Sequence, residues 1–433
     1  MKIFLIVLTI ILGLYALRGI IALLTTFKRK SYIKKIQNIE VKEYPQICVL
    51  LPALREQSIV NKTYDTFKNL NYPKDKIKVV FVTTQREEFE YEQKGEIVKT
   101  TNQLIEEKLK TDMVENYMHI HYPYEKGNKS SQLNYAIDEL FKNNVINDET
   151  YIGVFDFDSE PQSELFNDVA KVKQLYNADV LQPVPLFLKN VKDIAKNNKA
   201  FVFTHSMFQN VRAMGIETFR LLVKGKRRIT PLYCMGASCF IKTRTLLDCD
   251  KFPLVDDIQL GFRMLIRNKS FAYVPTIVLG DLPETLKAVL KQSIFINKGN
   301  YSAFKEVNAN RKDKVNSNFW GRVLIFWEGI SVISAKTFLP YLMFAMGLFC
   351  IITGEFLWFT VPLILAPVIR YLMGYISYRI VLKERVNVFC MILGLFVAVI
   401  WPFFLTYGAL KNIQLSINAK LFKKEIKFGK TER

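Results

Sequence analysis

The chain has 433 residues, enough for one large domain and further segments, and half of its residues are hydrophobic. Its formal net charge of +20 raises nucleic acid as a partner. Two of the three basic clusters, however, flank predicted membrane segments. Anionic lipid headgroups therefore explain most of the excess charge, and we expect no nucleic-acid partner. The three basic clusters are 28–35, 224–228 and 420–430.

The N-terminal segment predicts a membrane anchor. Residues 3–27 are apolar or neutral apart from Arg18. This segment is long enough to cross a bilayer core. The segment lacks the small-residue cleavage site of a signal peptide, so we expect a retained anchor over 1–27. Five lysines and arginines follow it, whereas only Lys2 precedes it. The positive-inside rule therefore places the chain from the basic linker 28–44 onward in the cytoplasm.

The next part of the chain alternates strand-like and helix-like segments, which predicts an α/β fold with an open, mostly parallel sheet covered on both faces. Ligands of such sheets bind beyond the carboxyl ends of the strands. Pro52, Thr84 and the pair Asp156 and Asp158 all follow predicted strand ends, so we expect them at one edge of the sheet. Strands are predicted at 47–51, 77–82, 119–122 and 151–155, and helices at 59–70, 96–109 and 130–141.

Two carboxylates, Asp156 and Asp158, follow the apolar run at 151–155 and alternate with Phe157. In an extended strand the side-chain period of two places both acids on the same side. Two close carboxylates raise one another's pKa unless a positive charge lies between them. Mg²⁺ is typically held by one or two carboxylates together with phosphate oxygens, so the pair predicts a metal that carries a phosphate ligand. The alternative is a pair of solvated acids at a strand end.

A glycine turn, Lys129 and two serines open the helix predicted at 130–141. The free N–H groups and the dipole of a helix N-terminus favour an anion. Further along, Asp256 and Asp257 lie at a predicted helix start. A carboxylate held there beside the sheet could act as a general base. The alternatives are a solvated surface lysine at 129, and a helix cap with a first-turn acid at 256–257.

Taken together and in this order, these residues resemble the family 2 glycosyltransferases, inverting nucleotide-sugar enzymes with a GT-A fold. The resemblance runs from 47 to about 299, and the membrane segments are arranged as in membrane-bound polysaccharide synthases and lipid glycosyltransferases. The matching motifs are 52–56, 129–136, 156–158, 180–182, 235–242, and 256–257 with Leu260 and Arg263.

The resemblance implies a role for each matching residue in a GT-A catalytic domain at 45–285. Asp158, with Asp156, would hold Mg²⁺ or Mn²⁺ on the donor diphosphate, and Asp257 would deprotonate the acceptor hydroxyl. The implied donor-binding residues are Pro52, Ala53, Glu56, Thr84, Lys129, Asn134 and Asp156. The residues implied for the acceptor side are Gln182, Gly236, Asp256, Arg263 and Gln292.

The chain departs from the family pattern in two places. In many members, an acidic residue after the second strand recognises the base of the nucleotide. Here Thr84 is the nearest match to that position, so recognition of the nucleotide base by a carboxylate is not predicted. Processive synthases carry Gln-x-x-Arg-Trp with a later glycine. Gln292 survives here, but Phe295 and Ile296 replace the arginine and the tryptophan. An aliphatic side chain offers a poor stacking face for a sugar, which favours a single transfer over polymerisation.

The C-terminal part predicts a multi-pass membrane protein. Three further apolar spans are predicted at 335–353, 356–378 and 386–410, within a transmembrane region 335–412 that precedes a basic tail, 413–433. The preceding region, 286–334, is predicted to be amphipathic and interfacial, since 319–336 mixes aromatic and charged residues. One anchor and three spans would leave the tail outside the cell, so either 319–336 enters the bilayer or one span lies flat.

The six cysteines show no paired zinc spacing, and we expect them to be reduced and structural. The sequence thus predicts a membrane-bound glycosyltransferase of the bacterial cell membrane with a cytoplasmic catalytic domain. The expected donor is a UDP-sugar, the transferred group a hexose or N-acetylhexosamine, and the acceptor a lipid or lipid-linked saccharide of the envelope. The alternatives are a processive polysaccharide synthase and a catalytically silent nucleotide-binding membrane scaffold.

Overall fold

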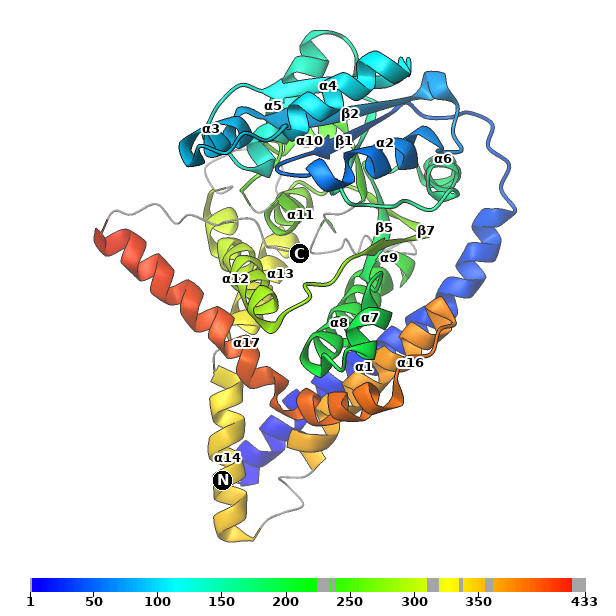
Figure 1. Ribbon diagram of the computed structural model, residues 1–433. Coiled ribbons are helices and arrows are strands. Elements are labelled where there is room, and N and C mark those ends of the chain that lie inside the picture. Colours follow the sequence, from blue (N-terminus) through cyan, green and yellow to red (C-terminus); the bar gives the residue numbers. More distant parts are fainter. Residues whose placement is uncertain are drawn as a thin grey trace. The chain divides into compact units, whose positions relative to one another are not determined.

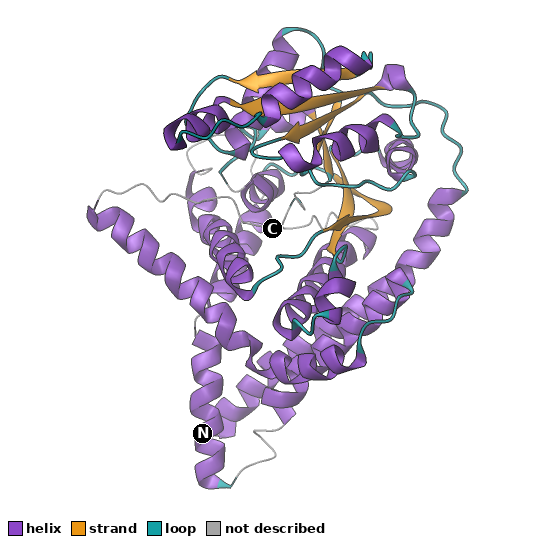
Figure 2. Cartoon of the chain, viewed as in Figure 1, coloured by secondary structure: helices purple, strands orange, loops and turns teal. Residues whose placement is uncertain are grey.

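A computed structural model describes the chain from Lys2 to Phe422 with gaps, and the chain divides into two compact units. We call the unit that contains the β-sheet the sheet unit and the other the helical unit (Figure 2). The sheet unit consists of Tyr32–Pro185 and Leu232–Gly280. The helical unit consists of Met1–Ser31, Leu186–Pro231 and Asp281–Arg433. The described residues are 2–223, 234, 238–254, 256–309, 319–334, 338–354 and 361–422.

Within the described residues, the sheet unit is built on seven strands in the order β3-β2-β1-β4-β6-β5-β7. Strands β1 to β4 are parallel to one another where they pair, and β6 is antiparallel to both β4 and β5. The predicted α/β architecture with a mostly parallel sheet is therefore confirmed. The strands are β1 Ile47–Pro52, β2 Ile77–Thr84, β3 Tyr117–Tyr122, β4 Tyr151–Val154, β5 Val180–Phe187, β6 Cys239–Lys242 and β7 Phe271–Gly280.

Helices cover both faces of this sheet (Figure 1). Odd-numbered residues of β1 and β2, such as Val49 and Phe81, form one core with side chains of α2, α4 and α6. Since strand side chains alternate, the even-numbered residues of these two strands face the other way. The buried stripe of α5, which includes Leu133 and Ile137, lies outside that core and covers the opposite face. The helices are α2 Val60–Lys68, α3 Gln85–Lys94, α4 Thr101–Asp112, α5 Lys129–Lys142, α6 Leu165–Tyr176, α10 Thr243–Asp248 and α11 Asp256–Ile266.

The helix predicted at 96–109 is wrong at its start, and a helix before it was not predicted. Gly95 adopts a left-handed conformation and ends α3. Thr100 then forms a capping box with Gln103, in which each side chain accepts from the other's backbone N–H. This reciprocal cap fixes the start of α4 at Thr101, because it satisfies two of the orphan donors of the first turn.

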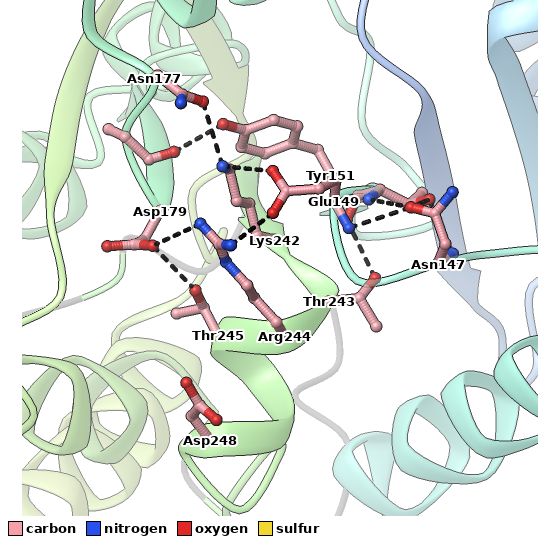
Figure 3. A network of polar contacts seen from close by, with 12 residues as sticks. Asn147, Glu149, Tyr151, Asn177, Asp179, Lys242, Thr243, Arg244, Thr245 and Asp248 are labelled. Atoms are coloured by element: carbon pink, nitrogen blue, oxygen red, sulfur yellow. Dashed lines mark hydrogen bonds and ion pairs between the residues drawn. The ribbon is translucent and has the colours of Figure 1, made fainter.

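At the end of β6, a polar network compensates the charge of a buried lysine (Figure 3). The side chain of Lys242 is 1 % exposed, and its Nζ lies 2.7 Å from a Glu149 carboxylate oxygen and 3.2 Å from Asn177 Oδ1. The hydrogen bond from Lys242 lowers the pKa of Glu149. Arg244 also contacts Glu149, with an N···O distance of 2.6 Å. The network lies at the amino end of β4, away from the carboxyl ends where ligands of such sheets bind.

The helical unit contains α1 as far as Ser31 and the C-terminal helices. Helix α1, Lys2–Gln37, runs without interruption through the predicted anchor. Within the described residues, two helical segments are long and apolar enough to cross a membrane, Leu363–Leu382 and Val388–Leu415, and the apolar segment Pro340–Thr353 is shorter. The further helices of this unit are α7 Val191–Lys196, α8 Ala200–Arg212, η3 Ala213–Thr218, α9 Phe219–Val223, α12 Leu286–Ala309, α13 Phe319–Ile333, α14 Leu339–Thr353, η5 Val361–Leu365, α16 Ala366–Leu382 and α17 Val388–Phe422.

Helix α13 buries one narrow stripe and exposes aromatic side chains. Gly329 packs closely on α12, where an added Cβ would lie 3.1 Å from the ring of Phe304. Trp320 and Trp327, in contrast, are 71 % and 67 % exposed. The helix thus has the aromatic surface that suits a membrane interface.

All six cysteines are buried and none of them forms a disulfide bond, as expected for structural thiols.

Candidate active site

The strand order reverses beside β1, which pairs with β2 on one side and with β4 on the other. In open parallel sheets, ligands bind at the carboxyl ends next to such a reversal. The backbone N–H of Phe155, just past β4, donates to Leu50 O of β1 at 3.2 Å. The chain that leaves β4 therefore runs beside the end of β1, which brings 156–158 and 52–56 to the same edge of the sheet.

The aspartate pair lies on a turn and not on an extended strand, so the predicted strand geometry is wrong in detail. Strand β4 ends at Val154, and the N–H of Ser159 donates to Asp156 O at 2.9 Å. The alternation of burial is nevertheless kept: Phe157 is buried, whereas Asp156 and Asp158 are half-buried. Phe157 is also fixed through its carbonyl, which accepts from Thr63 Oγ1 at 2.7 Å. The turn is thus anchored by its aromatic residue, and the two acids lie on the more exposed side.

Lys129 neutralises part of this negative charge. Its Nζ lies 2.9 Å from Asp156 Oδ1, and each of the two side chains is 34 % exposed. Lys129 is the first residue of α5, and Asn128 caps the helix by accepting from the N–H of Ser131 at 3.0 Å. The edge of the sheet after β4 therefore combines a lysine, a helix N-terminus and two carboxylates, and these groups can bind a metal together with a phosphate.

The carboxylate oxygens of Asp156 and Asp158 fit a metal that is bound together with a substrate phosphate. Among the residues that the structure describes, no group of three or more His, Cys, Asp and Glu side chains could hold a metal by itself. Mg²⁺ needs only one or two protein carboxylates when substrate phosphates and water supply the other oxygens. Asp156 and Asp158 match that requirement. Hard oxygen ligands also exclude a thiolate-type zinc site at this position.

A buried carboxylate that the sequence analysis missed shapes the loop after β1. Glu87 of α3 is 1 % exposed and accepts from the backbone N–H groups of Arg55 and Thr101 at 2.8 and 2.7 Å. Its Oε1 also accepts from Gln57 Nε2 at 2.9 Å. Arg55 has a φ of 58°, a left-handed conformation that a non-glycine residue adopts only when its surroundings hold it there. Glu87 thus holds the loop in the shape it has at the sheet edge.

The predicted donor residues of β1 and β2 lie at this edge. Ala53 is buried, and its N–H donates to Val82 O at 2.9 Å, which extends the β1–β2 ladder past Pro52. Glu56 is half-buried, and its N–H donates to Thr101 Oγ1 at 2.9 Å. Thr84 is buried and caps α3, because its hydroxyl accepts from the N–H of Arg86.

A hydrogen-bonded network next to Thr84 fixes the Nε2–H tautomer of His119, which is partly buried. Asn102 donates through Nδ2 to a Glu88 oxygen at 2.9 Å, so its Oδ1 faces Thr83 and accepts from that hydroxyl at 3.1 Å. Thr83 Oγ1 can then only accept from His119 Nε2 at 2.7 Å and from His121 Nδ1 at 2.9 Å. Burial, and to a smaller extent the neighbouring His121, lower the pKa of His119 to about 4.

Asp257, the candidate base, lies in the first turn of α11. Together with Val154 of β4, Cys239 of β6 and Phe252, it lines a small pocket, so α11 begins beside the strand that precedes the aspartate pair. Its Oδ1 accepts from the N–H of Ile258 at 2.7 Å, and its carbonyl accepts from the N–H of Cys234 at 3.1 Å. For the neighbouring Asp256, only the backbone is among the described residues.

Several residues predicted to contact substrate are bonded to the protein's own backbone. Asn134 exchanges two hydrogen bonds with the main chain of Phe252, both at 2.9 Å. Arg263 donates to the carbonyls of Cys249 and Asp250 at 3.2 and 3.4 Å. Both side chains therefore hold the segment that leads into α11.

The other predicted acceptor residues are spread over the chain. Gln182 is fully buried in β5 and donates to Pro183 O at 2.7 Å. Gln292 belongs to α12 of the helical unit, where it accepts from Gln209 at 3.4 Å. Gly236 lies outside the described residues. The structure thus brings the donor and base residues together within one unit, and their functional roles stay predictions.

No protein-family model and no curated protein match the sequence. Among solved structures, the chain is similar to the mannosyltransferase PcManGT from Pyrobaculum calidifontis, which was determined in complex with GDP-Man and Mn²⁺. The similarity covers 94 % of this chain and 99 % of that chain, with a TM-score of 0.52 and 12 % sequence identity. TarS 1–349 from S. aureus, in complex with UDP-GlcNAc, matches 77 % of this chain and 89 % of its own with a TM-score of 0.39 and 12 % identity. The similarity to PcManGT shows that the chain has the fold of a glycosyltransferase.

The substitution Glu87→Gln tests the buried acid. The amide of glutamine is neutral, so the charge-assisted hydrogen bonds of the carboxylate are lost, and its NH₂ group faces backbone N–H groups that are also donors. We expect this to cost about 2–3 kcal/mol of stability. We expect a lower melting temperature of the detergent-solubilised protein. Glu92→Gln, on an exposed position of the same helix, is the matched control and should melt like the wild type. Equal melting of both variants would show that Glu87 does not hold the loop.

The lowered pKa of His119 predicts that the protein loses stability in mild acid. Its pKa is lowered from 6.5 to about 4, so the unfolded chain binds a proton first as the pH falls. The folded state is unaffected above pH 6.5 and loses roughly 3 kcal/mol as the pH falls from 6.5 to 4, since each pKa unit corresponds to about 1.4 kcal/mol. His119→Gln, which keeps an amide donor for Thr83, should flatten this part of the stability–pH curve. A curve identical to that of the wild type would contradict the assignment.

Proposed function

We propose that this protein is a membrane-bound, inverting glycosyltransferase related to family 2, which transfers a sugar from a nucleotide-sugar donor to a lipid or lipid-linked saccharide. The observation that carries this proposal is the contact between Lys129 and Asp156. It joins a helix N-terminus to the carboxyl end of β4, next to Asp158, and Asp257 lies beside the same strand. Such a site can bind a diphosphate on one side and deprotonate a hydroxyl on the other.

The donor half of the site would bind the nucleoside diphosphate. Asp158 and Asp156 would hold Mg²⁺ or Mn²⁺, which supplies positive charge to the diphosphate as it leaves. Lys129, now paired with Asp156, can turn to a phosphate oxygen when the metal takes over that carboxylate. Pro52 and Thr84, at the ends of β1 and β2, and Ala53 and Glu56, on the loop after β1, would line the nucleoside. The Mn²⁺ and GDP-Man of the similar mannosyltransferase support this metal class and donor class.

The acceptor half would use Asp257 as the general base. Its carboxylate takes the proton of the acceptor hydroxyl while that oxygen bonds to the anomeric carbon of the sugar. The bond from this carbon to the diphosphate oxygen breaks at the same time, and the nucleoside diphosphate leaves with the electron pair. Attack from the face opposite the leaving group inverts the configuration. A UDP-sugar is the expected donor, and a guanosine donor belongs in the same assay because of PcManGT.

The helical unit supports an acceptor in the membrane. Two of its described helices are long and apolar enough to span a bilayer, and α13 exposes Trp320 and Trp327. A lipid-linked acceptor would diffuse in that layer to a cytoplasmic catalytic domain. Phe295 and Ile296 stand where processive synthases carry arginine and tryptophan, which favours transfer of one sugar over chain growth.

The silent-scaffold alternative predicts nucleotide binding without turnover. The retention of Asp156, Asp158 and Asp257 speaks against it. A panel of UDP- and GDP-sugars with Mn²⁺, membrane lipid extract and purified protein in detergent separates the two. Released nucleoside diphosphate together with glycosylated lipid supports the transferase, whereas nucleotide binding without release from any donor supports the scaffold.

Removing the metal ligand should abolish transfer. For Asp158→Asn we expect a decrease in kcat of at least about 100-fold, since loss of charge stabilisation at a leaving group costs that much. Chelation by EDTA should have the same effect on the wild type, and added Mn²⁺ should reverse it. Asp75→Asn is the control, because Asp75 is exposed and lies before β2, at the opposite end of the sheet. Full activity of Asp158→Asn would refute the metal assignment.

Removing the base should separate binding from chemistry. Asp257→Asn leaves the diphosphate site intact, so the Kd for the nucleotide measured by titration calorimetry should stay within about twofold while transfer falls by about 100- to 10,000-fold. Loss of nucleotide binding and transfer together would refute the role of Asp257 as a base. The mass of the glycosylated product, one added sugar or a ladder, distinguishes single transfer from polymerisation.

A further inference from the structure

Three polar side chains of α5 form a stripe along one side of the helix. Ser130, Asn134 and Asp138 follow one another at every fourth position, so they lie one above the other on the same face. All three contact the segment 251–253, which precedes α11. Ser130 Oγ donates to Pro253 O at 2.5 Å, and Asp138 forms an ion pair with Lys251.

The middle contact is reciprocal. Asn134 Nδ2 donates to Phe252 O at 2.9 Å, and Asn134 Oδ1 accepts from the N–H of Phe252 at 2.9 Å. An amide is the side chain that can donate and accept at once with this geometry; a carboxylate can only accept, and an aliphatic residue can do neither. Both ends of the Asn134 amide are therefore bound to one backbone unit.

The held segment needs this support. Asp250 and Lys251 have φ values of 56° and 55°, left-handed conformations that are costly for non-glycine residues unless the surrounding structure holds them. On the other side, Arg263 binds the carbonyl of Asp250. Phe252 itself is buried and lines the same pocket as Asp257. The position of Phe252 thus sets where α11 and its first-turn carboxylate begin.

We propose that Asn134 is a positioning residue for the base Asp257, and not a donor ligand as the resemblance implied. The inference rests on the proposed function. Because Lys129 begins the same helix, α5 connects the residue that faces the donor phosphate with the segment that places the base. One rigid helix therefore fixes the separation between the leaving group and the attacking hydroxyl, which in-line displacement requires.

The test compares Asn134→Ala with Asn143→Ala, an exposed asparagine at the C-terminal end of the same helix. We expect Asn134→Ala to lower kcat by about 10- to 100-fold, the effect of a slightly misplaced catalytic group, with a donor Kd within about twofold of the wild type. Asn143→Ala should leave both values unchanged. A raised donor Kd with unchanged kcat would overturn the proposal in favour of a donor contact.

Hydrogen exchange supplies a readout that does not depend on activity. In Asn134→Ala, amides of 252–264 should exchange faster, whereas those of β1 should keep the wild-type rate. Unchanged exchange of 252–264 would overturn the proposal even if the enzyme proved inactive with every donor tried. If the wild type transfers sugar and Asn134→Ala keeps its kcat, the positioning role fails while the proposed function stands.

A double variant shows whether Asn134 acts through the base. Once Asp257→Asn has removed the base, adding Asn134→Ala should lower the residual rate by less than about twofold, since residues that act as one unit are not additive. A further decrease as large as that of Asn134→Ala alone would show that Asn134 acts independently of Asp257, and would overturn the proposal. Melting temperatures of all variants identify a loss of fold.

Discussion

The repulsion between two carboxylates at the end of β4 is the constraint on which the site depends. Asp156 and Asp158 lie two residues apart on a tight turn, and nothing about a strand end requires acids there. Their charge must be compensated, and Lys129 does so in part at 2.9 Å. Because that lysine begins α5, compensation also fixes the helix against the turn. The same electrostatic need that suits this turn to a cation thereby joins two elements that are far apart in the sequence.

Helix α5 performs two structural tasks with two of its faces. Its apolar stripe, with Leu133 and Ile137, covers one side of the parallel sheet. Its polar stripe, with Asn134 at the centre, binds the main chain before α11. A helix held on both faces cannot rotate or slide without losing buried contacts. The position of Lys129 at its first turn is therefore set by packing far from the turn itself, which is how a scaffold orders a site before the substrate arrives.

The sequence analysis predicted the alternation of strands and helices, because β-branched strands and amphipathic helices leave periodic patterns. It also located the acids past the strand ends. It missed α3 and Glu87, since a helix rich in Glu, Gln and Lys without an apolar stripe does not differ from a solvated loop. The acid at 87 was visible, three residues past β2, but only the fold shows that backbone N–H groups of Arg55 and Thr101 bind it. Long-range partners leave no local signal.

Burial and bonding divide the polar residues at and around the candidate site into two kinds. Glu87, Asn134 and Arg263 bond to backbone groups and set the shape of the loops that follow β1 and lead into α11. Asp156, Asp158 and Lys129 remain about half-buried at the sheet edge, where a ligand can reach them. A pattern of identical residue types in a sequence cannot separate these kinds, because both need polar side chains at fixed spacings. The distinction has a physical basis: a group already bonded to the main chain must break those bonds before it can bind substrate, whereas a half-exposed charge exchanges water for a phosphate or a metal.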